Sequence, residues 1–150
     1  MKKHVFAAAA AAAFVLMPGF AATAQETPSP EGASVYFVNL ADGAVVTSPF
    51  KVVFGLTGMG VAPVGTEKEN TGHHHLLINR AKLGEGPDGA DELVYAVPAD
   101  DNHVHFGGGQ TETMVELPPG THTLQLVLGD AGHVPHLPPV TSDLISVTVE

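Results

Sequence analysis

Short apolar runs separated by glycine and proline make up most of the chain after about residue 33. The runs are rich in β-branched and aromatic residues and show no 3.6-residue period, which favours strands over helices. Residues 121–128 (THTLQLVL) alternate strictly, so Leu124, Leu126 and Leu128 fall on one face of a predicted strand. We predict strands at residues 35–40, 50–56, 74–79, 92–97, 111–117, 121–128 and 144–149.

About seven short strands with turn signals between them are typical of an all-β domain. The spacing predicts a single immunoglobulin-like antiparallel β-sandwich over residues 33–150. The chain contains no cysteine and no tryptophan. The usual disulfide and tryptophan of antibody domains are therefore missing, and the prediction rests on the number and spacing of strands.

The first residues have the pattern of a secretory signal peptide. Lys2 and Lys3 precede an apolar stretch at residues 5–16, and the small residues 22–24 follow. We predict a signal peptide at residues 1–24, with an uncleaved anchor as the alternative, and a flexible lead-in at residues 25–32. The protein is then periplasmic or secreted. Its mature part has no other run near the ~20 apolar residues of a membrane span.

The charge balance excludes some partners. The formal net charge is −10, and removal of Lys2 and Lys3 with the leader makes it −12. A surface this acidic repels phosphate backbones, so we expect no nucleic-acid partner, whereas it attracts cations. Without cysteine there is no thiolate site and no redox pair. A metal ion must therefore be held by imidazole, carboxylate or thioether groups.

Histidines are the main candidates for chemistry. In a sandwich, alternate connections between strands lie at opposite ends. The links at residues 57–73, 98–110 and 129–140 should therefore share one end, provided that residues 92–97 form a strand. That end would hold His73, His74, His75, His103, His105, His133 and His136. His122 begins a strand at the other end, and we expect it to be structural.

Local spacing refines this grouping. His103 and His105 stand two apart in an extended segment and should point the same way, as should His73 and His75, while His74 points to the opposite face. Imidazole suits copper, zinc and nickel. The pattern predicts an exported, histidine-rich module that binds a divalent metal ion, copper or zinc, for carriage, buffering or delivery.

Other side chains extend this hypothesis. Met59 lies at the same predicted end and offers a thioether to copper(I). Glu67, Glu69 and Glu112 are candidate partners for ligand histidines, or solvated surface residues. Met114 is expected in the core.

Two alternatives stay open. Histidines at strand edges or in loops also serve as hydrogen-bonding scaffold. The loops would then form a protein- or glycan-binding surface, for instance for a periplasmic protein partner. A metalloenzyme, for example one acting on superoxide, needs an open coordination position and a substrate channel as well, and the sequence shows neither. We therefore do not favour an enzyme.

Several segments carry a family resemblance. They are SPFKVVFGLTGMGVAP, NTGHHHLLIN, DDNHVHFGGGQTET, LPPGTHTLQLVLGDAGHVPHLPP and ISVTV. Together they closely resemble the bacterial family catalogued as domain of unknown function 4399 (DUF4399), over residues 34–149. The resemblance implies an exported, single-domain β protein whose recurrent motifs contain the eight histidines from His73 to His136. It implies no particular activity. Residues 83–101 depart from the family's pattern, which bears on the strand predicted at residues 92–97.

Overall fold

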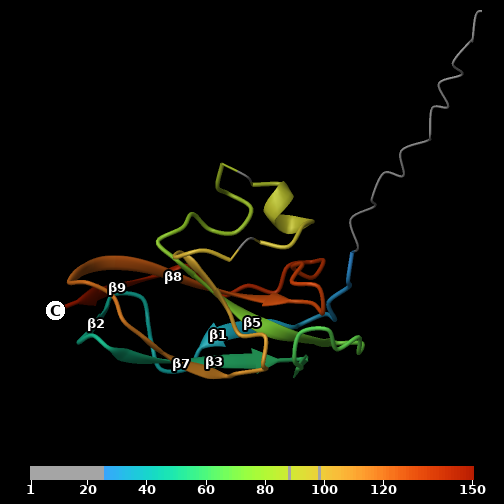
Figure 1. Ribbon diagram of the computed structural model, residues 1–150, viewed down its shortest axis with the longest axis horizontal. Helices are drawn as coiled ribbons and strands as arrows, with labels where there is room; N and C mark the ends of the chain where they lie inside the picture. The colour runs from blue at the N-terminus through green and yellow to red at the C-terminus, as the bar shows by residue number, and fades with distance from the viewer. Residues whose placement is uncertain (1–25, 88, 98) are drawn as a thin grey trace, which may run out of the picture.

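The computed structural model describes residues 26–87, 89–97 and 99–150 (Figure 1). In this part of the chain almost every regular element is a strand, and the exception is one short 3₁₀ helix. The prediction of an all-β protein is confirmed. The predicted signal peptide, residues 1–24, lies outside the described residues.

The smaller of two sheets has three antiparallel strands in the order β1-β3-β7. These are β1 (Ser34–Phe37), β3 (Phe50–Thr57) and β7 (Glu112–Val115). The sheet lies along the lower side of the view in Figure 1.

The larger sheet has the order β2-β9-β8-β5-β4, and β6 also pairs with β5. Its strands are β2 (Ala44–Val46), β4 (Gly60–Val61), β5 (Thr71–Ile78), β6 (His103–His105), β8 (Gly120–Gly129) and β9 (Ile145–Val149). The β2–β9 and β4–β5 pairs are parallel, and the others are antiparallel. Strands β2, β4 and β6 were not predicted, because two or three residues are too few to show an alternation.

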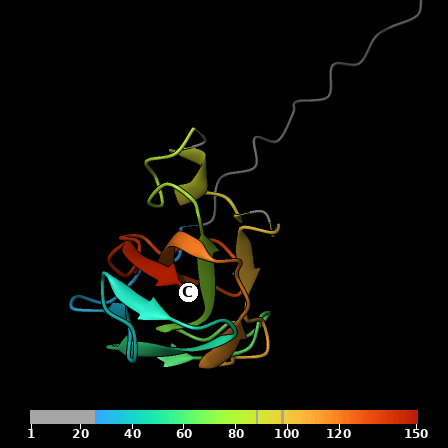
Figure 2. The same cartoon turned by 90° about the vertical axis from the view of Figure 1, so that its left-hand side faces the viewer.

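The main hydrophobic core draws side chains from both sheets. Val52 of β3, Leu126 of β8 and Val147 of β9 are all fully buried in it. Leu124 and Leu128 are also fully buried, which confirms the predicted apolar face of residues 121–128. Burial of each such side chain stabilises the fold by roughly 1.5–3 kcal/mol. Viewed from the side, the strands curl around this core (Figure 2).

Strands β5 and β8 are buried on their second face as well. The described residues between β5 and β6, which are 79–87, 89–97 and 99–102, lie over that face, above the sheet in Figure 1. Among them, Leu83 and Val97 pack with Leu77 of β5 and Val127 of β8 in a smaller apolar cluster. Gln125 of β8 is buried here too, and its Oε1 accepts a hydrogen bond from the backbone N–H of Leu83 at 2.9 Å.

The strand predicted at residues 92–97 is wrong. Asp91–Leu93 forms the 3₁₀ helix η1 instead. The apolar residues of this stretch cover a sheet face, where Val97 is buried and Leu93 packs beside it. They do not pair with any of the described strands. The buried Glu92 carboxylate pairs with Arg80 and accepts a hydrogen bond from the backbone N–H of Gly84 at 3.2 Å.

One further expectation, a core position for Met114, differs from the structure. Met114 is 57% exposed, because it lies on the outer face of β7 at the edge of the smaller sheet. Part of the predicted flexible lead-in is hydrogen-bonded to the loop after β8. The backbone N–H of Leu137 donates to the carbonyl of Thr27 at 2.9 Å, and the N–H of Ser29 donates to the carbonyl of Leu137 at 3.2 Å. These residues are therefore attached to the domain.

Within the described residues, we find no helix with the length and apolar character needed to cross a membrane.

Candidate metal centre

The triplet His73–His75 lies inside strand β5, and the pleat divides it between two faces. His73 and His75 point to the outer face, where His75 is registered opposite His105 of β6 and His73 opposite Gly129 of β8. His74 points the other way, into the main core, with its ring centroid 5.1 Å from that of Phe54.

Five imidazole rings gather on the outer face, and we call them the histidine cluster. Its members are His73, His75, His103, His105 and His133. Ring centroids are 4.6 Å apart for His73 and His75, 5.0 Å for His75 and His103, and 4.9 Å for His105 and His133. Long-range convergence was predicted, but its cause is different. His103 and His105 arrive because β6 pairs directly with β5, and no strand at residues 92–97 is needed.

Hydrogen bonds link the rings of the cluster in pairs. His75 Nδ1 lies 2.8 Å from His103 Nε2, and His73 Nε2 lies 3.1 Å from His133 Nδ1. Each link requires one protonated and one unprotonated nitrogen, so it fits neutral imidazoles. One nitrogen from each of His73, His75 and His133 lies within 4.8 Å of the other two. We call these three residues the histidine trio.

One ring nitrogen of His75 makes no hydrogen bond. This nitrogen, Nε2, is buried and has no hydrogen-bond partner. A buried polar atom without a partner typically costs about 1–3 kcal/mol. The ring fits only because residue 129 is glycine, since a Cβ there would lie 2.4 Å from this nitrogen. The chain thus keeps an unpaired, buried nitrogen in one member of the cluster, next to Gly129.

Burial keeps the three rings of the histidine trio neutral. It lowers the pKa of His75 from 6.5 to about 2, and repulsion from neighbouring imidazoles, His73 first, adds to the effect. The pKa of His73 falls to about 4 through burial and then His133 and His105, against a smaller opposing effect of Asp130. Burial and His105 also lower the pKa of His133. At pH 7 the trio therefore offers unprotonated nitrogens, as metal ligation requires.

The Asp130 carboxylate shapes the loop that carries His133. Its Oδ1 accepts hydrogen bonds from the backbone N–H groups of Gly132 (2.8 Å) and Val134 (2.9 Å), and its Oδ2 accepts one from the Thr27 hydroxyl at 2.6 Å. His133 itself has a left-handed backbone, with φ of 69°. Such a conformation costs energy in a residue other than glycine and persists only where surrounding contacts fix it.

Asp130 was not among the residues predicted for the site. The carboxylates proposed as ligand partners lie elsewhere: Glu112 is exposed on β7 and pairs with Lys51 at 2.8 Å. Glu67 and Glu69 line a separate cleft of about 450 Å³. The signal in the sequence was the short polar turn Asp-Ala-Gly-His, in which an aspartate commonly bonds backbone N–H groups two residues on.

Replacement of Asp130 by alanine is expected to release this loop. The variant leaves three donors without their acceptor, and we expect a loss of about 2–4 kcal/mol in the free energy of unfolding. Urea denaturation at pH 7 measures it. Thr27→Val removes only the Oδ2 bond and should cost much less. Equal stability of Asp130→Ala and the wild type would contradict a structural role for the carboxylate.

Comparison with known proteins places the chain in a family. The family described as Domain of unknown function (DUF4399) matches residues 52–150. The chain belongs to this family. The matched part includes the whole histidine cluster, and the DUF4399 resemblance of the sequence is confirmed. No curated protein matches the chain.

One solved structure similar to this DUF4399 protein is the X-ray structure of the endo-beta-1,4-mannanase from Thermotoga petrophila. The TM-score is 0.45 and the sequences are 13% identical. The match covers 80% of this chain and 20% of the mannanase chain. This chain therefore spans about a fifth of the length of that enzyme, and we draw no conclusion from the likeness.

Two of the histidines that were predicted as ligands in this DUF4399 domain lie outside the cluster. His74 is fully buried in the main core, and neither ring nitrogen meets a hydrogen-bond partner. Burial lowers its pKa more than the nearby backbone of Gln110 raises it. His136 is buried too, and its Nδ1 donates to the carbonyl of Leu128 at 3.2 Å. The seven residues proposed as ligands thus divide into a group of five and two that stand apart.

His122 and Met59 have structural surroundings. His122 Nε2 donates to the carbonyl of Pro118 at 2.9 Å, and its Nδ1 accepts from the Asn79 amide at 3.0 Å. Both nitrogens are therefore used, as expected for a structural histidine. Met59 is half-buried and packs against the main core.

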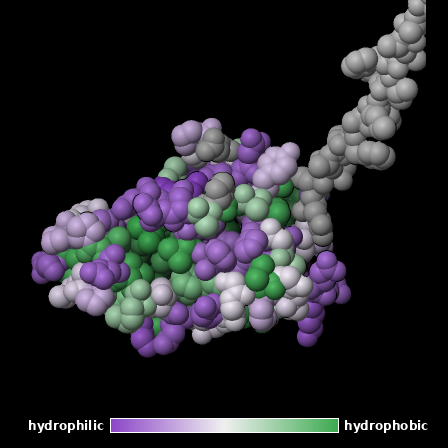
Figure 3. All heavy atoms as spheres, viewed as in Figure 1, coloured by the Kyte–Doolittle hydropathy of each residue, from purple (hydrophilic) through white to green (hydrophobic). Residues whose placement is uncertain are grey.

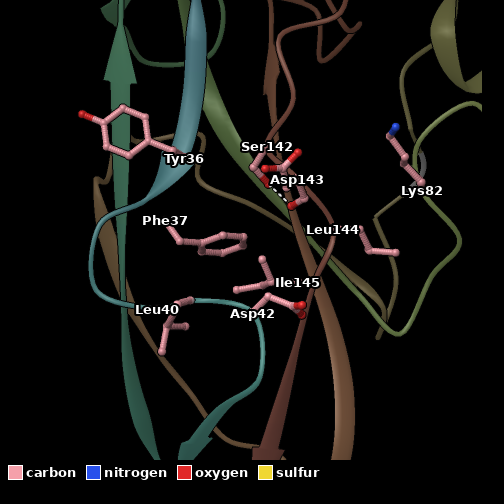
Figure 4. Close-up of a pocket in the computed structure, with 10 residues that line it drawn as sticks. Tyr36, Phe37, Leu40, Asp42, Lys82, Ser142, Asp143, Leu144 and Ile145 are labelled. Carbon is pink, nitrogen blue, oxygen red and sulfur yellow. Dashed lines mark hydrogen bonds between the residues drawn. The ribbon is translucent and has the colours of Figure 1, made fainter.

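Two clefts differ sharply in chemistry. A small one of about 160 Å³ adjoins the cluster and is lined by Ala96, Val97, Ala99, His103, His105 and His133. A larger one of about 640 Å³ lies between β1 and residues 142–145, and none of the described residues in its wall is a histidine. Figure 4 shows the Phe37 ring directed toward Ile145, with Leu40 below them and Lys82 at the far side. Apolar side chains also reach the surface between polar ones on the face shown in Figure 3.

Proposed function

We propose that this protein binds one copper or zinc ion through the histidine trio, His73, His75 and His133. The observation that carries the proposal is geometric. Three imidazoles from two distant segments offer nitrogens within 4.8 Å of one another, and the cluster contains the unpaired, buried Nε2 of His75. An ion would satisfy a nitrogen that is otherwise costly to bury.

The donor set restricts the choice of ion. All three donors are imidazoles, which suit zinc and copper better than magnesium or calcium. With metal–nitrogen bonds of roughly 2.0–2.1 Å, tetrahedral ligands stand about 3.3 Å apart, so small ring rotations would complete the site. Zinc favours a tetrahedron and copper(II) a flatter arrangement.

His103 has a supporting place in this proposal. A ligand histidine almost always donates its second N–H to a fixed acceptor, which sets its tautomer and orientation. The 2.8 Å link between His75 Nδ1 and His103 Nε2 supplies such a partner. With the proton on Nδ1, His75 presents an unprotonated Nε2.

The remaining expectations complete the proposal. We infer that residues 1–24 direct export, so the protein acts in the periplasm or outside the cell, where it carries, buffers or delivers the metal. We also infer that the two sheets around one core correspond to an immunoglobulin-like sandwich. The antiparallel β1–β3–β7 and β5–β8–β9 groups support this assignment.

Metal titration of protein purified without a histidine tag tests the function. Calorimetry with copper(II) and with zinc should show about one equivalent bound to the wild type. His73→Ala should lose this binding, because the trio then keeps two ligands. His122→Gln is the matched control, since it removes an imidazole outside the cluster and should bind as the wild type does.

Two results would contradict the proposal: no heat of binding with either ion, or equal binding by His73→Ala and the wild type. Either would favour the alternative in which the histidines are scaffold for an interaction surface.

A further inference from the structure

The histidine cluster is closed on one side and open on the other. His73 and His75 are 1% and 3% exposed, and β8 lies directly against them through Gly129. His133 is half-buried and His105 is exposed. The cleft of about 160 Å³ lies on this open side, and His133 belongs both to its wall and to the trio.

We infer that the metal site has an exchangeable coordination position facing this cleft, which accepts a small anionic or neutral donor ligand from solution. The inference rests on the proposed metal binding and deepens it. Three protein nitrogens leave at least one position of a four-coordinate ion unfilled, and such an open position distinguishes reactive sites from purely structural ones.

The wall of the cleft sets the class of ligand. Its non-histidine residues are Ala96, Val97 and Ala99, which are small and aliphatic. At about 30 Å³ per water molecule, the volume corresponds to roughly five waters, enough for azide or imidazole and too little for a sugar or peptide. The polar side chains that the described part of the chain places in the wall are the imidazoles of His103, His105 and His133.

Charge supports an anion in this position. Among the described residues, no carboxylate lines this cleft, although the protein is acidic overall. The neighbouring clefts differ, since one is lined by Glu67, Glu69 and Asp130. Another is lined by Asp91, Glu92 and Asp100. An anion in the small cleft therefore meets imidazoles and methyl groups.

The step is a ligand exchange. A donor atom of the incoming molecule forms a bond to the ion, a solvent water leaves through the cleft, and no electron is transferred. Azide is a suitable probe with copper(II), because its coordination produces a charge-transfer absorption and changes the electron paramagnetic resonance spectrum.

Copper(II)-loaded, tag-free protein titrated with azide tests the inference. The wild type should show a saturable charge-transfer band. Ala99→Phe fills the cleft from an exposed position and should bind copper as before while losing the azide response. Ala90→Phe is the matched control, because Ala90 is an exposed alanine between β5 and β6 that does not line the cleft. This variant should keep both copper binding and the azide response.

The outcomes separate the two proposals. Absence of copper binding by the wild type overturns the proposed function and this inference with it. Copper binding without an azide response overturns the inference alone, as does an azide response in Ala99→Phe equal to that of the wild type. Should Ala99→Phe lose copper binding, Ala96→Phe places a ring in the same cleft from another lining position. An azide response in copper-loaded Ala96→Phe equal to that of the wild type would then overturn the inference.

Discussion

Gly129→Ala is expected to abolish metal binding, although residue 129 offers no ligand. A Cβ at this position would lie 2.4 Å from Nε2 and 2.9 Å from Cδ2 of His75. The ring cannot swing aside freely, because it is 3% exposed, bonded to His103 and packed 4.6 Å from the His73 ring. It would have to leave the trio or push β8 away from β5.

Calorimetry with zinc and copper(II) measures the effect. Loss of a residue that only hydrogen-bonds a metal ligand typically lowers metal affinity by about 10- to 100-fold. Displacement of a ligand itself should therefore weaken binding by at least about 100-fold. Gly60→Ala is the control: it lies in β4 beside the same strand β5, and its Cβ would make only ordinary contacts, with Thr71 Cγ2 at 3.5 Å and the Asn70 carbonyl oxygen at 4.0 Å. Wild-type affinity in Gly129→Ala would show that His75 is not a ligand.

Acidification from pH 6.5 to pH 5 is expected to destabilise the metal-free protein strongly. In the unfolded chain the histidines take up protons near pH 6.5, whereas in the fold the pKa of His73 is about 4 and that of His75 about 2. The unfolded state then binds more protons, so stability is complete above pH 6.5 and is lost as the pH falls. The loss is about 2 kcal/mol from each of these two histidines over this interval.

Urea denaturation at pH 7, 6, 5.5 and 5, with a chelator present, measures this dependence. His73→Gln and His75→Gln should each flatten the curve, because each removes one group that must stay neutral in the fold. A wild-type stability that is constant between pH 7 and pH 5 would contradict the buried, neutral state of these rings.

Much of the fold was predictable from the sequence because strand residues alternate between two faces. Leu124, Leu126 and Leu128 were assigned to one face and are fully buried together. The same rule placed His73 and His75 on one face and His74 on the other, and the structure confirms it.

Residues 92–97 could not be interpreted in this way. An apolar run of that length fits a strand, and it fits equally a segment that covers a sheet from outside. Leu93 and Val97 pack on the outer face of β5 and β8. That this face is covered by residues from another part of the chain becomes visible only in the folded structure. The exposure of Met114 has a related cause, since it depends on β7 being an edge strand with nothing above it.

By itself the sequence determined that the chain forms short strands, that imidazole is its main candidate ligand group for a metal ion, and that His73 and His75 share a face. These properties depend on local periodicity and on residue type. Tertiary structure alone decided that β6 lies against β5, that the loop held by Asp130 brings His133 over that face, and that His136 stays apart. The reason is that β6 and His133 reach β5 across about 30 and 60 positions of the chain, and no local pattern records which distant segments will pair.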